Sequence, residues 1–231
     1  MVMGFTSCND DNDALTDSRL TTYANFDMQG DEFVEVALGS VYEDAGCKAT
    51  LNGQDITSQI VTTGEVDPNT AGFYYINYAY TNVDGYTTSV TRTVAVFDPS
   101  VTTDLSGDYV TVSGSYCYIF SSGGVIPLVG MTISLEKVLP GLFNVTDLLG
   151  GLYDQYVGYG SDYAMEGIIQ LTSSNEIIPL SGLVPGWGDS FDVAYSGTYD
   201  PETKQVSWAL EYAELYYIEI VIKPDVEEEE D

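Results

Sequence analysis

One long hairpin in the sequence constrains the fold more than any other feature. Residues 72–97 hold two runs of β-branched and aromatic residues on either side of Asn82-Val83-Asp84-Gly85. Such runs favour β-strands, and Gly85 can adopt the positive φ that a tight turn needs. Asp98-Pro99 ends the second run, because proline has no N–H to donate to a strand ladder. The pattern predicts an antiparallel hairpin in an all-β chain.

Short strand patterns precede this hairpin. Residues 31–36, 40–42 and 59–63 fit strands, and Asn52-Gly53 is a strong signal for a hairpin turn. Roughly seven short strands in ~75 residues fit a two-sheet sandwich better than a barrel. The first part of the chain is therefore predicted to be a β-sandwich.

The second half of the chain also reads as strands joined by turns. Pro201 presets φ in the turn at residues 199–204, and Asp200 can accept a hydrogen bond from the backbone ahead of it. Strands are predicted at residues 115–120, 131–137, 142–146, 164–172, 176–180, 191–199, 205–212 and 216–223. Eight or nine antiparallel strands without a clear helix predict an antiparallel β-barrel or a strongly curled sheet, which leaves few exposed edges.

Two ordered sets of motifs resemble known families. Gly-x-Tyr/Phe-x-Ile-x-Tyr, Asp-Gly and Thr-Arg-Thr-Val-x-Val, within residues 28–98, resemble the last strands of bacterial immunoglobulin-like domains, which are common in surface lipoproteins of Bacteroidetes. Leu-Ser-Gly-x-Tyr, Gly-x-Tyr-Asp-x-x-Thr and Val-x-Trp, within residues 101–224, resemble the lipocalin-like C-terminal domains of Bacteroidetes lipoproteins. The first resemblance implies a spacer or presentation module, and neither brings catalytic residues.

These patterns divide the chain into four parts. Residues 1–24 are expected to be a lipoprotein signal remnant and disordered tether, and residues 25–99 an Ig-like β-sandwich. Residues 100–224 are expected to form the antiparallel β-barrel domain. The like-charged residues 225–231 are expected to be an acidic, disordered tail.

The N-terminal stretch resembles the clipped end of a lipoprotein signal. Small residues Thr6 and Ser7 precede Cys8, which would become the first mature residue and carry the acyl chains. The apolar run is too short to span a membrane. The acidic residues 9–13 are similar to signals that send lipoproteins to the outer face of the outer membrane. A disordered terminus with a chance cysteine is the alternative.

Charge excludes several classes of partner. The 231 residues include 36 Asp and Glu against 6 Lys and Arg, which gives a formal net charge of −30. Nucleic acids and anionic lipid surfaces are bound through clustered cations, so such a chain would repel them. We expect no nucleic-acid partner, and membrane attachment only through an N-terminal lipid.

Composition also limits the chemistry. The chain has no histidine and three cysteines, Cys8, Cys47 and Cys117, which excludes His-assisted nucleophiles and zinc sites built on imidazole or on four cysteines. We expect no metal, no cofactor and no catalytic residue. Cys47 and Cys117 fit two buried thiols better than a disulfide, although a bridge stays open.

One glycine-rich stretch interrupts the strand pattern and carries the candidate site. Sugars bind to aromatic rings that stack on their C–H faces and to short polar side chains that hydrogen-bond the hydroxyls. Residues 147–163 offer both, and a second glycine-rich loop at residues 183–189 adds a tryptophan. The candidate ligand-binding residues are Tyr153, Asp154, Tyr156, Tyr159, Tyr163 and Trp187. The alternative is that these rings pack against the end of the barrel, because aromatic side chains bury well.

Three functions remain open on the sequence. The first is a non-catalytic outer-surface lipoprotein that binds or presents glycan, as an accessory to polysaccharide utilisation. The second is a structural or adhesion module whose partner is another surface protein. The third is a glycosidase with two carboxylates, which ranks last because a sandwich and a small barrel leave little room for a cleft.

Overall fold

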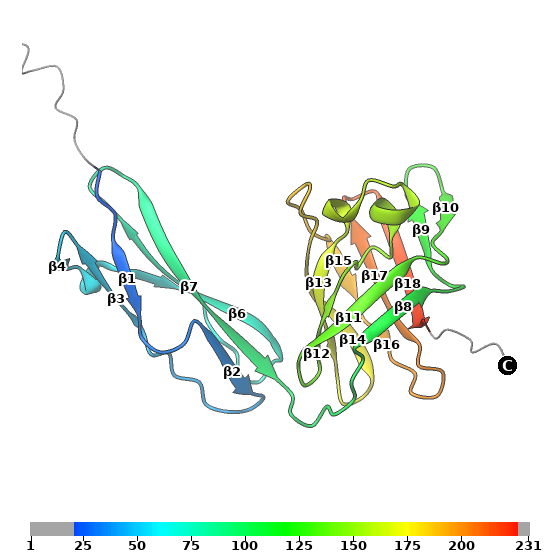
Figure 1. The fold of residues 1–231 in the computed structure, drawn as a ribbon, viewed down its shortest axis with the longest axis horizontal. Helices are drawn as coiled ribbons and strands as arrows, with labels where there is room; N and C mark the ends of the chain where they lie inside the picture. Colours follow the sequence, from blue (N-terminus) through cyan, green and yellow to red (C-terminus); the bar gives the residue numbers. More distant parts are fainter. Residues whose placement is uncertain (1–20, 226–231) are drawn as a thin grey trace, which may run out of the picture. The chain divides into compact units, whose positions relative to one another are not determined.

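The structure is a computed structural model that describes residues 21–225, and it is all-β (Figure 1). The chain forms two compact units. The first comprises residues 21–30, Ala45–Thr63 and Asn77–Thr91, and the second comprises Asp31–Asp44, Gly64–Ile76 and residues 92–225. Strands of the N-terminal Ig-like domain therefore contribute to both units.

A three-stranded sheet lies in the first unit. It joins β1 (Asn25–Met28), β3 (Cys47–Leu51) and β4 (Gln54–Asp55), followed by a 3-10 turn at Thr57–Gln59. The predicted turn at Asn52 and Gly53 connects β3 to β4, and both residues have positive φ, at 51° and 78°. Ala49 and Tyr80, from β3 and β6, pack together with Ile56, as expected for facing sheets of a sandwich.

The second Ig-like sheet has the strand order β2-β7-β6-β5. Its strands are β2 (Phe33–Ala37), β5 (Val61–Thr63), β6 (Gly72–Thr81) and β7 (Thr87–Phe97). The predicted hairpin is confirmed as β6 and β7. Its turn is held by the Asn82 side chain, whose Oδ1 accepts the N–H groups of Asp84 (3.0 Å) and Tyr86 (2.9 Å). β2 pairs parallel to β7, which the sequence pattern did not indicate.

The segment after β2 is a loop, so the strand predicted at residues 40–42 is wrong. Local side-chain bonds replace strand pairing here: the Tyr42 hydroxyl donates to Asp44 Oδ1 (2.9 Å). Arg92 of β7 is fully buried, donates from Nε to the carbonyl oxygen of Asp31 (3.0 Å), and pairs with the Asp44 carboxylate. A buried cation on β7 thus holds this loop against the sheet.

An eleven-stranded antiparallel sheet forms the C-terminal domain. Its strands are β8 (Gly107–Thr111), β9 (Tyr116–Ile119), β10 (Gly124–Pro127), β11 (Thr132–Leu139), β12 (Leu142–Val145), β13 (Glu166–Leu171), β14 (Glu176–Leu183), β15 (Val193–Tyr195), β16 (Gly197–Thr198), β17 (Val206–Tyr212) and β18 (Tyr216–Pro224). The main path is β10-β9-β18-β8-β11-β12-β13-β14-β16, and β18 also pairs with β17, which pairs with β15. The hairpin strand β10 was not predicted.

This sheet curls into a half-barrel, as the alternation of strands and turns predicted. β16 is the last strand of the main path, and directly after it the backbone of Tyr199 bridges to Val206 at the start of β17. The N–H of Thr198 also donates to Ser207 Oγ (3.2 Å). The end of β16 and the start of β17 therefore meet without a full ladder between them.

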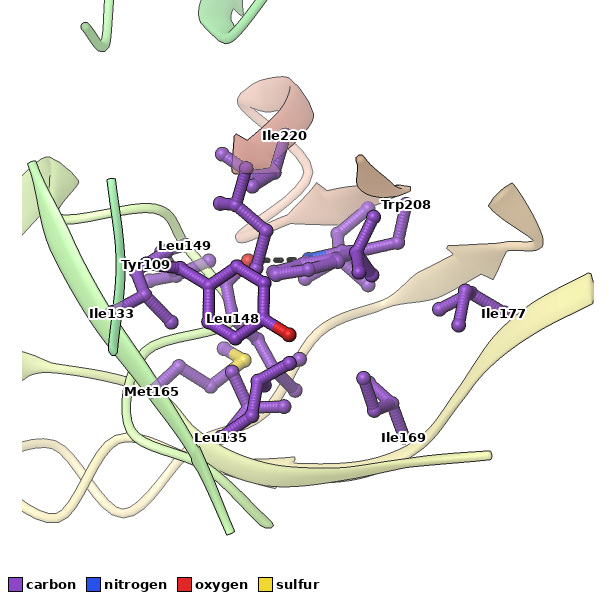
Figure 2. Packing of buried hydrophobic residues seen from close by; sticks show 14 of the residues in the cluster. Tyr109, Ile133, Leu135, Leu148, Leu149, Met165, Ile169, Ile177, Trp208 and Ile220 are labelled. Atoms are coloured by element: carbon purple, nitrogen blue, oxygen red, sulfur yellow. Dashed lines mark hydrogen bonds between the residues drawn. The ribbon is translucent and has the colours of Figure 1, made fainter. Parts of the chain in front are cut away.

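The inward side chains of the curled sheet form the main core (Figure 2). Trp208 is 1% exposed, and its Nε1–H donates to the carbonyl oxygen of Leu148 (2.9 Å), so its polar atom is satisfied within the core. Cys117 has a free, buried thiol whose pKa burial raises to about 11. Cys117 forms no disulfide with Cys47, which is half-buried and not buried as expected. Among residues 21–225, no helix has the length and apolar character to cross a membrane.

Candidate functional site

A buried carboxylate positions the glycine-rich segment that was predicted to carry the site. Asp147 follows β12 and is 2% exposed. Its Oδ1 accepts the N–H groups of Leu149 (2.8 Å) and Met165 (3.0 Å), and its Oδ2 accepts that of Gly151 (2.9 Å). Burial raises the pKa of Asp147 to about 6, and the three N–H donors oppose the rise. One side chain therefore closes the loop of residues 147–165 at both ends.

Two glycines let this loop pack tightly before it turns outward. Gly150 and Gly151 have φ of 68° and 80°, and a Cβ on Gly150 would lie 2.1 Å from Ile220 Cδ1. A single π-helical turn follows at Leu152–Tyr156, in which the N–H of Tyr156 donates to the carbonyl oxygen of Gly151 (2.8 Å). Single π-turns are rare in proteins, and many of those that occur lie at functional sites. The turn lies at one end of the curled sheet (Figure 1).

The second loop brings Trp187 to the same place. The N–H of Gly186 donates to the carbonyl oxygen of Asp162 (2.6 Å), and the N–H of Gly188 donates to that of Val184 (2.7 Å). A Cβ on Gly186 would lie 2.8 Å from Tyr163 Cε1, so glycine permits this close approach. Backbone bonds thus hold the two loops together.

Four predicted residues form one cluster of rings, Tyr153, Tyr159, Tyr163 and Trp187. The Trp187 ring stands edge to face against Tyr153 and Tyr163, with ring centroids 4.7 Å and 4.9 Å apart. Tyr159 lies 5.3 Å from Tyr163 and stacks at 12° to Tyr153, at 6.2 Å. These separations are in the range of favourable aromatic pairs. We call this set the ring cluster.

The outer side of the ring cluster faces solvent. Trp187 is 44% exposed and Tyr159 56% exposed, whereas Tyr153 and Tyr163 are half-buried. Gly158, Tyr159, Tyr163 and Trp187 line an open hollow of about 520 Å³. The arrangement offers ring faces to a ligand, with buried rings below them.

Two predicted residues do not join the cluster. Tyr156 is half exposed and makes none of these ring contacts, and Asp154 is half-buried in the π-turn. The structure adds two rings that sequence analysis missed: Tyr212 and Tyr216 lie 6.1 Å and 6.4 Å from Tyr153. Both stand at positions facing the core on neighbouring strands, so only the strand pairing could have revealed them.

The phenols below the surface are held neutral. Burial and the neighbouring Tyr216 hydroxyl raise the pKa of Tyr153 far above its usual value. Burial likewise raises the pKa of Tyr212, whose hydroxyl donates to Asp189 Oδ1 (2.9 Å). Asp189 belongs to the Trp187 loop, and residues 138 to 203 contain no Lys or Arg. Within residues 21–225, no group of three or more His, Cys, Asp or Glu side chains could hold a metal ion.

Two family models match the chain. A model described as a bacterial surface protein Ig-like domain matches residues 26–96, and a model of a C-terminal domain matches residues 98–224. The chain thus pairs an Ig-like domain of bacterial surface proteins with a second β-domain. The crystal structure of the lipoprotein BT2262 from Bacteroides thetaiotaomicron is 37% identical, with a TM-score of 0.49, over 87% of this chain and 100% of that chain. The chain belongs to the family of that lipoprotein.

Two structures of ZmpB from Clostridium perfringens are also similar. One holds its catalytic domain with two CBM51 domains (12% identity, TM-score 0.28, 88% of this chain and 21% of that chain). The other holds a CBM51 domain in complex with GlcNAc (13% identity, TM-score 0.27, 88% and 44%). Likenesses this weak have no bearing on function. Among curated proteins, none matches the chain.

Proposed function

We propose that this protein is a non-catalytic surface lipoprotein that binds glycan at the ring cluster. One observation carries the proposal: the rings of Tyr159, Tyr163 and Trp187 converge on an open hollow and stay partly exposed. Aromatic rings that face water are costly unless a ligand covers them, and exposed apolar patches mark binding sites. The C–H face of a sugar is a flat apolar surface of matching size.

Packing accounts for only part of the ring cluster. Tyr153 contacts Tyr212 and Tyr216, which close the end of the core, so its role is structural. Trp187 and Tyr159 lie above it and are about half exposed. Rings that served packing alone would gain most by being buried. The exposed half of the cluster therefore supports binding.

The lining of the hollow favours binding over hydrolysis. Glycosidases place two carboxyl groups on either side of the scissile bond, about 5–10 Å apart. The residues that line the hollow are Gly158, Tyr159, Tyr163 and Trp187, and none of them is acidic. We therefore place the glycosidase last, and the adhesion module with a protein partner remains the alternative to glycan binding.

A glycan array of neutral and acidic polysaccharides tests the proposal. Wild-type protein should bind at least one neutral polysaccharide, and Trp187→Ala and Tyr159→Ala should each weaken that binding about tenfold, by analogy with rings that stack on bases. Tyr75→Ala is a matched control, because Tyr75 is 57% exposed on β6. Binding that survives both ring substitutions would refute the site.

We further propose that the protein is anchored by acyl chains on Cys8 and faces outward from the outer membrane. Support comes from the small residues before Cys8 and from the lipoprotein relative, although Cys8 lies outside the described residues. Labelled fatty acid should enter the wild-type protein in its native host and not Cys8→Ser. Equal labelling of both proteins would overturn the anchor. External protease should digest the protein on intact cells, and resistance to that protease would overturn the outward orientation.

A further inference from the structure

A second group of aromatic side chains lies on the outer face of the curled sheet. Tyr116 and Tyr118 on β9, Tyr217 on β18 and Tyr195 on β15 alternate along their strands with the buried side chains of the core. We call these four residues the outer aromatic surface. It shares no residue with the ring cluster.

Strand register aligns these side chains across the sheet. Tyr217 pairs with Tyr118 on β9 and with Glu211 on β17. One step along, Glu219 of β18 pairs with Tyr116. Because residues opposite each other on neighbouring strands point to the same face, rings and carboxylates form two adjacent rows.

The rings of this surface are close together and partly open to solvent. Tyr217 lies between Tyr116 and Tyr195, with ring centroids 6.2 Å and 5.9 Å away. Tyr118 is 36% exposed and Tyr195 41% exposed. Four neighbouring rings, two of them more than a third exposed, indicate an interaction surface.

Hydrogen bonds fix two of the rings in place. The Tyr195 hydroxyl donates to Glu211 Oε1 and the Tyr217 hydroxyl to Glu219 Oε2, both at 2.6 Å. These rings lose little conformational freedom when a ligand covers them. Each carboxylate keeps further lone pairs, which can accept hydroxyl donors. The surface therefore presents apolar faces and hydrogen-bond acceptors together.

Charge narrows the partner. A second copy of the chain would bring together two bodies of formal charge −30, and nucleic acids or acidic glycans would meet Glu211 and Glu219. An uncharged carbohydrate chain has C–H faces for the rings and hydroxyl donors for the carboxylates, and it suffers no repulsion. Its chemistry fits the surface best.

The two aromatic regions meet on one strand. Tyr216 of β18 contacts Tyr153 of the ring cluster, with centroids 6.4 Å apart, and the next residue, Tyr217, belongs to the outer aromatic surface. Successive residues of a strand point to opposite faces, so the two regions lie on opposite faces of the sheet near the start of β18.

We propose that the outer aromatic surface is a second carbohydrate-binding region, which takes an uncharged polysaccharide chain. The proposal rests on the proposed function for its ligand class only, because its residues and geometry are separate. It implies recognition along a chain of many sugar units, beyond the few that the ring cluster could cover.

Affinity electrophoresis tests this surface against the ring cluster. Gels containing starch, xylan, galactomannan, mixed-linkage β-glucan or yeast mannan are compared with gels containing polygalacturonate. The test variant is Tyr118→Ala with Tyr217→Ala, Trp187→Ala probes the ring cluster, and Tyr75→Ala is the control. Tyr195→Ala, on the edge strand β15, replaces the double variant if its unfolding midpoint falls sharply.

The double variant should bind a neutral polysaccharide that retards the wild type at least about tenfold more weakly than the wild type does. Tyr75→Ala should bind it as tightly as the wild type. If Trp187→Ala loses affinity and the double variant does not, the second region is refuted and the proposed function stands. The reverse pattern refutes the ring cluster and keeps the outer surface. If no neutral polysaccharide retards the wild type, or if the surface instead binds oligolysine in fluorescence anisotropy, the inference falls.

Discussion

Two buried charges hold two irregular segments of this protein, and they do so by different means. Arg92 is fully buried and pairs with the Asp44 carboxylate, which belongs to the loop after β2 and is 25% exposed. Asp147 is equally buried, but its carboxylate is held by three backbone N–H groups of its own loop. In the first case the loop contacts the buried charge through a charged side chain, that of Asp44. In the second case the loop contacts the buried charge through backbone N–H groups.

The difference bears on where a binding site can lie. Because Asp147 is satisfied by backbone, the rings of Tyr153, Tyr159 and Tyr163 take no part in holding its carboxylate and can form the ring cluster. The loop after β2 uses Tyr42 and Asp44 to secure its own attachment. A segment whose shape is fixed by main-chain bonds can change its surface side chains without losing its conformation.

The largest loss of stability is expected when the ion pair between Arg92 and Asp44 is broken. Asp44→Ala removes the carboxylate that pairs with Arg92, whose side chain is only 1% exposed. The free energy of unfolding should therefore fall by about 3–5 kcal/mol. Chemical denaturation of wild type and variant measures this loss. The matched control is Asp84→Ala, an acidic residue in the turn of the same hairpin. A loss below about 1 kcal/mol would show that the pair is unimportant.

A somewhat smaller loss of stability, which depends on pH, is expected when the Asp147 carboxylate is removed. Asp147→Ala leaves three buried N–H groups without their acceptor, which should cost about 3 kcal/mol. Because burial raises the pKa of Asp147 to about 6, its stabilising contribution is complete below about pH 4 and declines as the pH rises through 6. The gap between wild type and variant should therefore narrow by roughly 1 kcal/mol from pH 5 to pH 7. A gap that widens over this range would contradict the raised pKa.

Gly186→Ala should affect the site more than the fold. The new Cβ would lie 2.8 Å from Tyr163 Cε1 and 2.9 Å from the carbonyl oxygen of Asp162, so the Trp187 loop must move. We expect a loss of about 1–3 kcal/mol in stability, as for other overpacked sites, together with loss of glycan binding. Gly188→Ala is the contrast, because its Cβ would meet open space, although its φ of 73° adds backbone strain. Unchanged binding in Gly186→Ala would separate the Trp187 loop from function.

The smallest stability effect is expected for Trp187→Ala. Its ring is 44% exposed and mainly contacts other rings of the cluster, so about 1 kcal/mol should be lost. Trp208→Ala provides the comparison, since a fully buried tryptophan should cost about 3–5 kcal/mol. If the two tryptophans cost the same, the ring cluster is packing and the proposed site fails.

Local patterns in the sequence predicted most of the strands. The hairpin of β6 and β7, the Asn52-Gly53 turn and the alternation along β17 depend on neighbouring residues, so they could be read from the chain. The parallel pairing of β2 with β7 depends on contacts across about sixty residues, and no local signal carries it. The domain boundary near residue 99 stays a prediction.

Four of the six candidate residues lie together in the structure, but the sequence did not reveal what holds them there. Aromatic residues beside glycines indicated the ring cluster, because both types are visible in sequence. The role of Asp147 was hidden, since any acidic residue before Leu148 and Leu149 could equally have faced solvent. The π-turn was missed because its glycines indicate an irregular loop rather than a helix. Burial and long-range N–H bonds decide both features, and sequence patterns do not report them.

The three hydrogen bonds that the Asp147 carboxylate accepts also have a consequence for amide hydrogen exchange. The amides of Leu149 and Gly151 lie at one end of the loop and that of Met165 at the other, yet all three are protected by the same carboxylate. One opening event should therefore expose all three to solvent deuterium, with one shared opening free energy. We therefore expect the loop to open as one unit, so that the rings it carries lose their positions together.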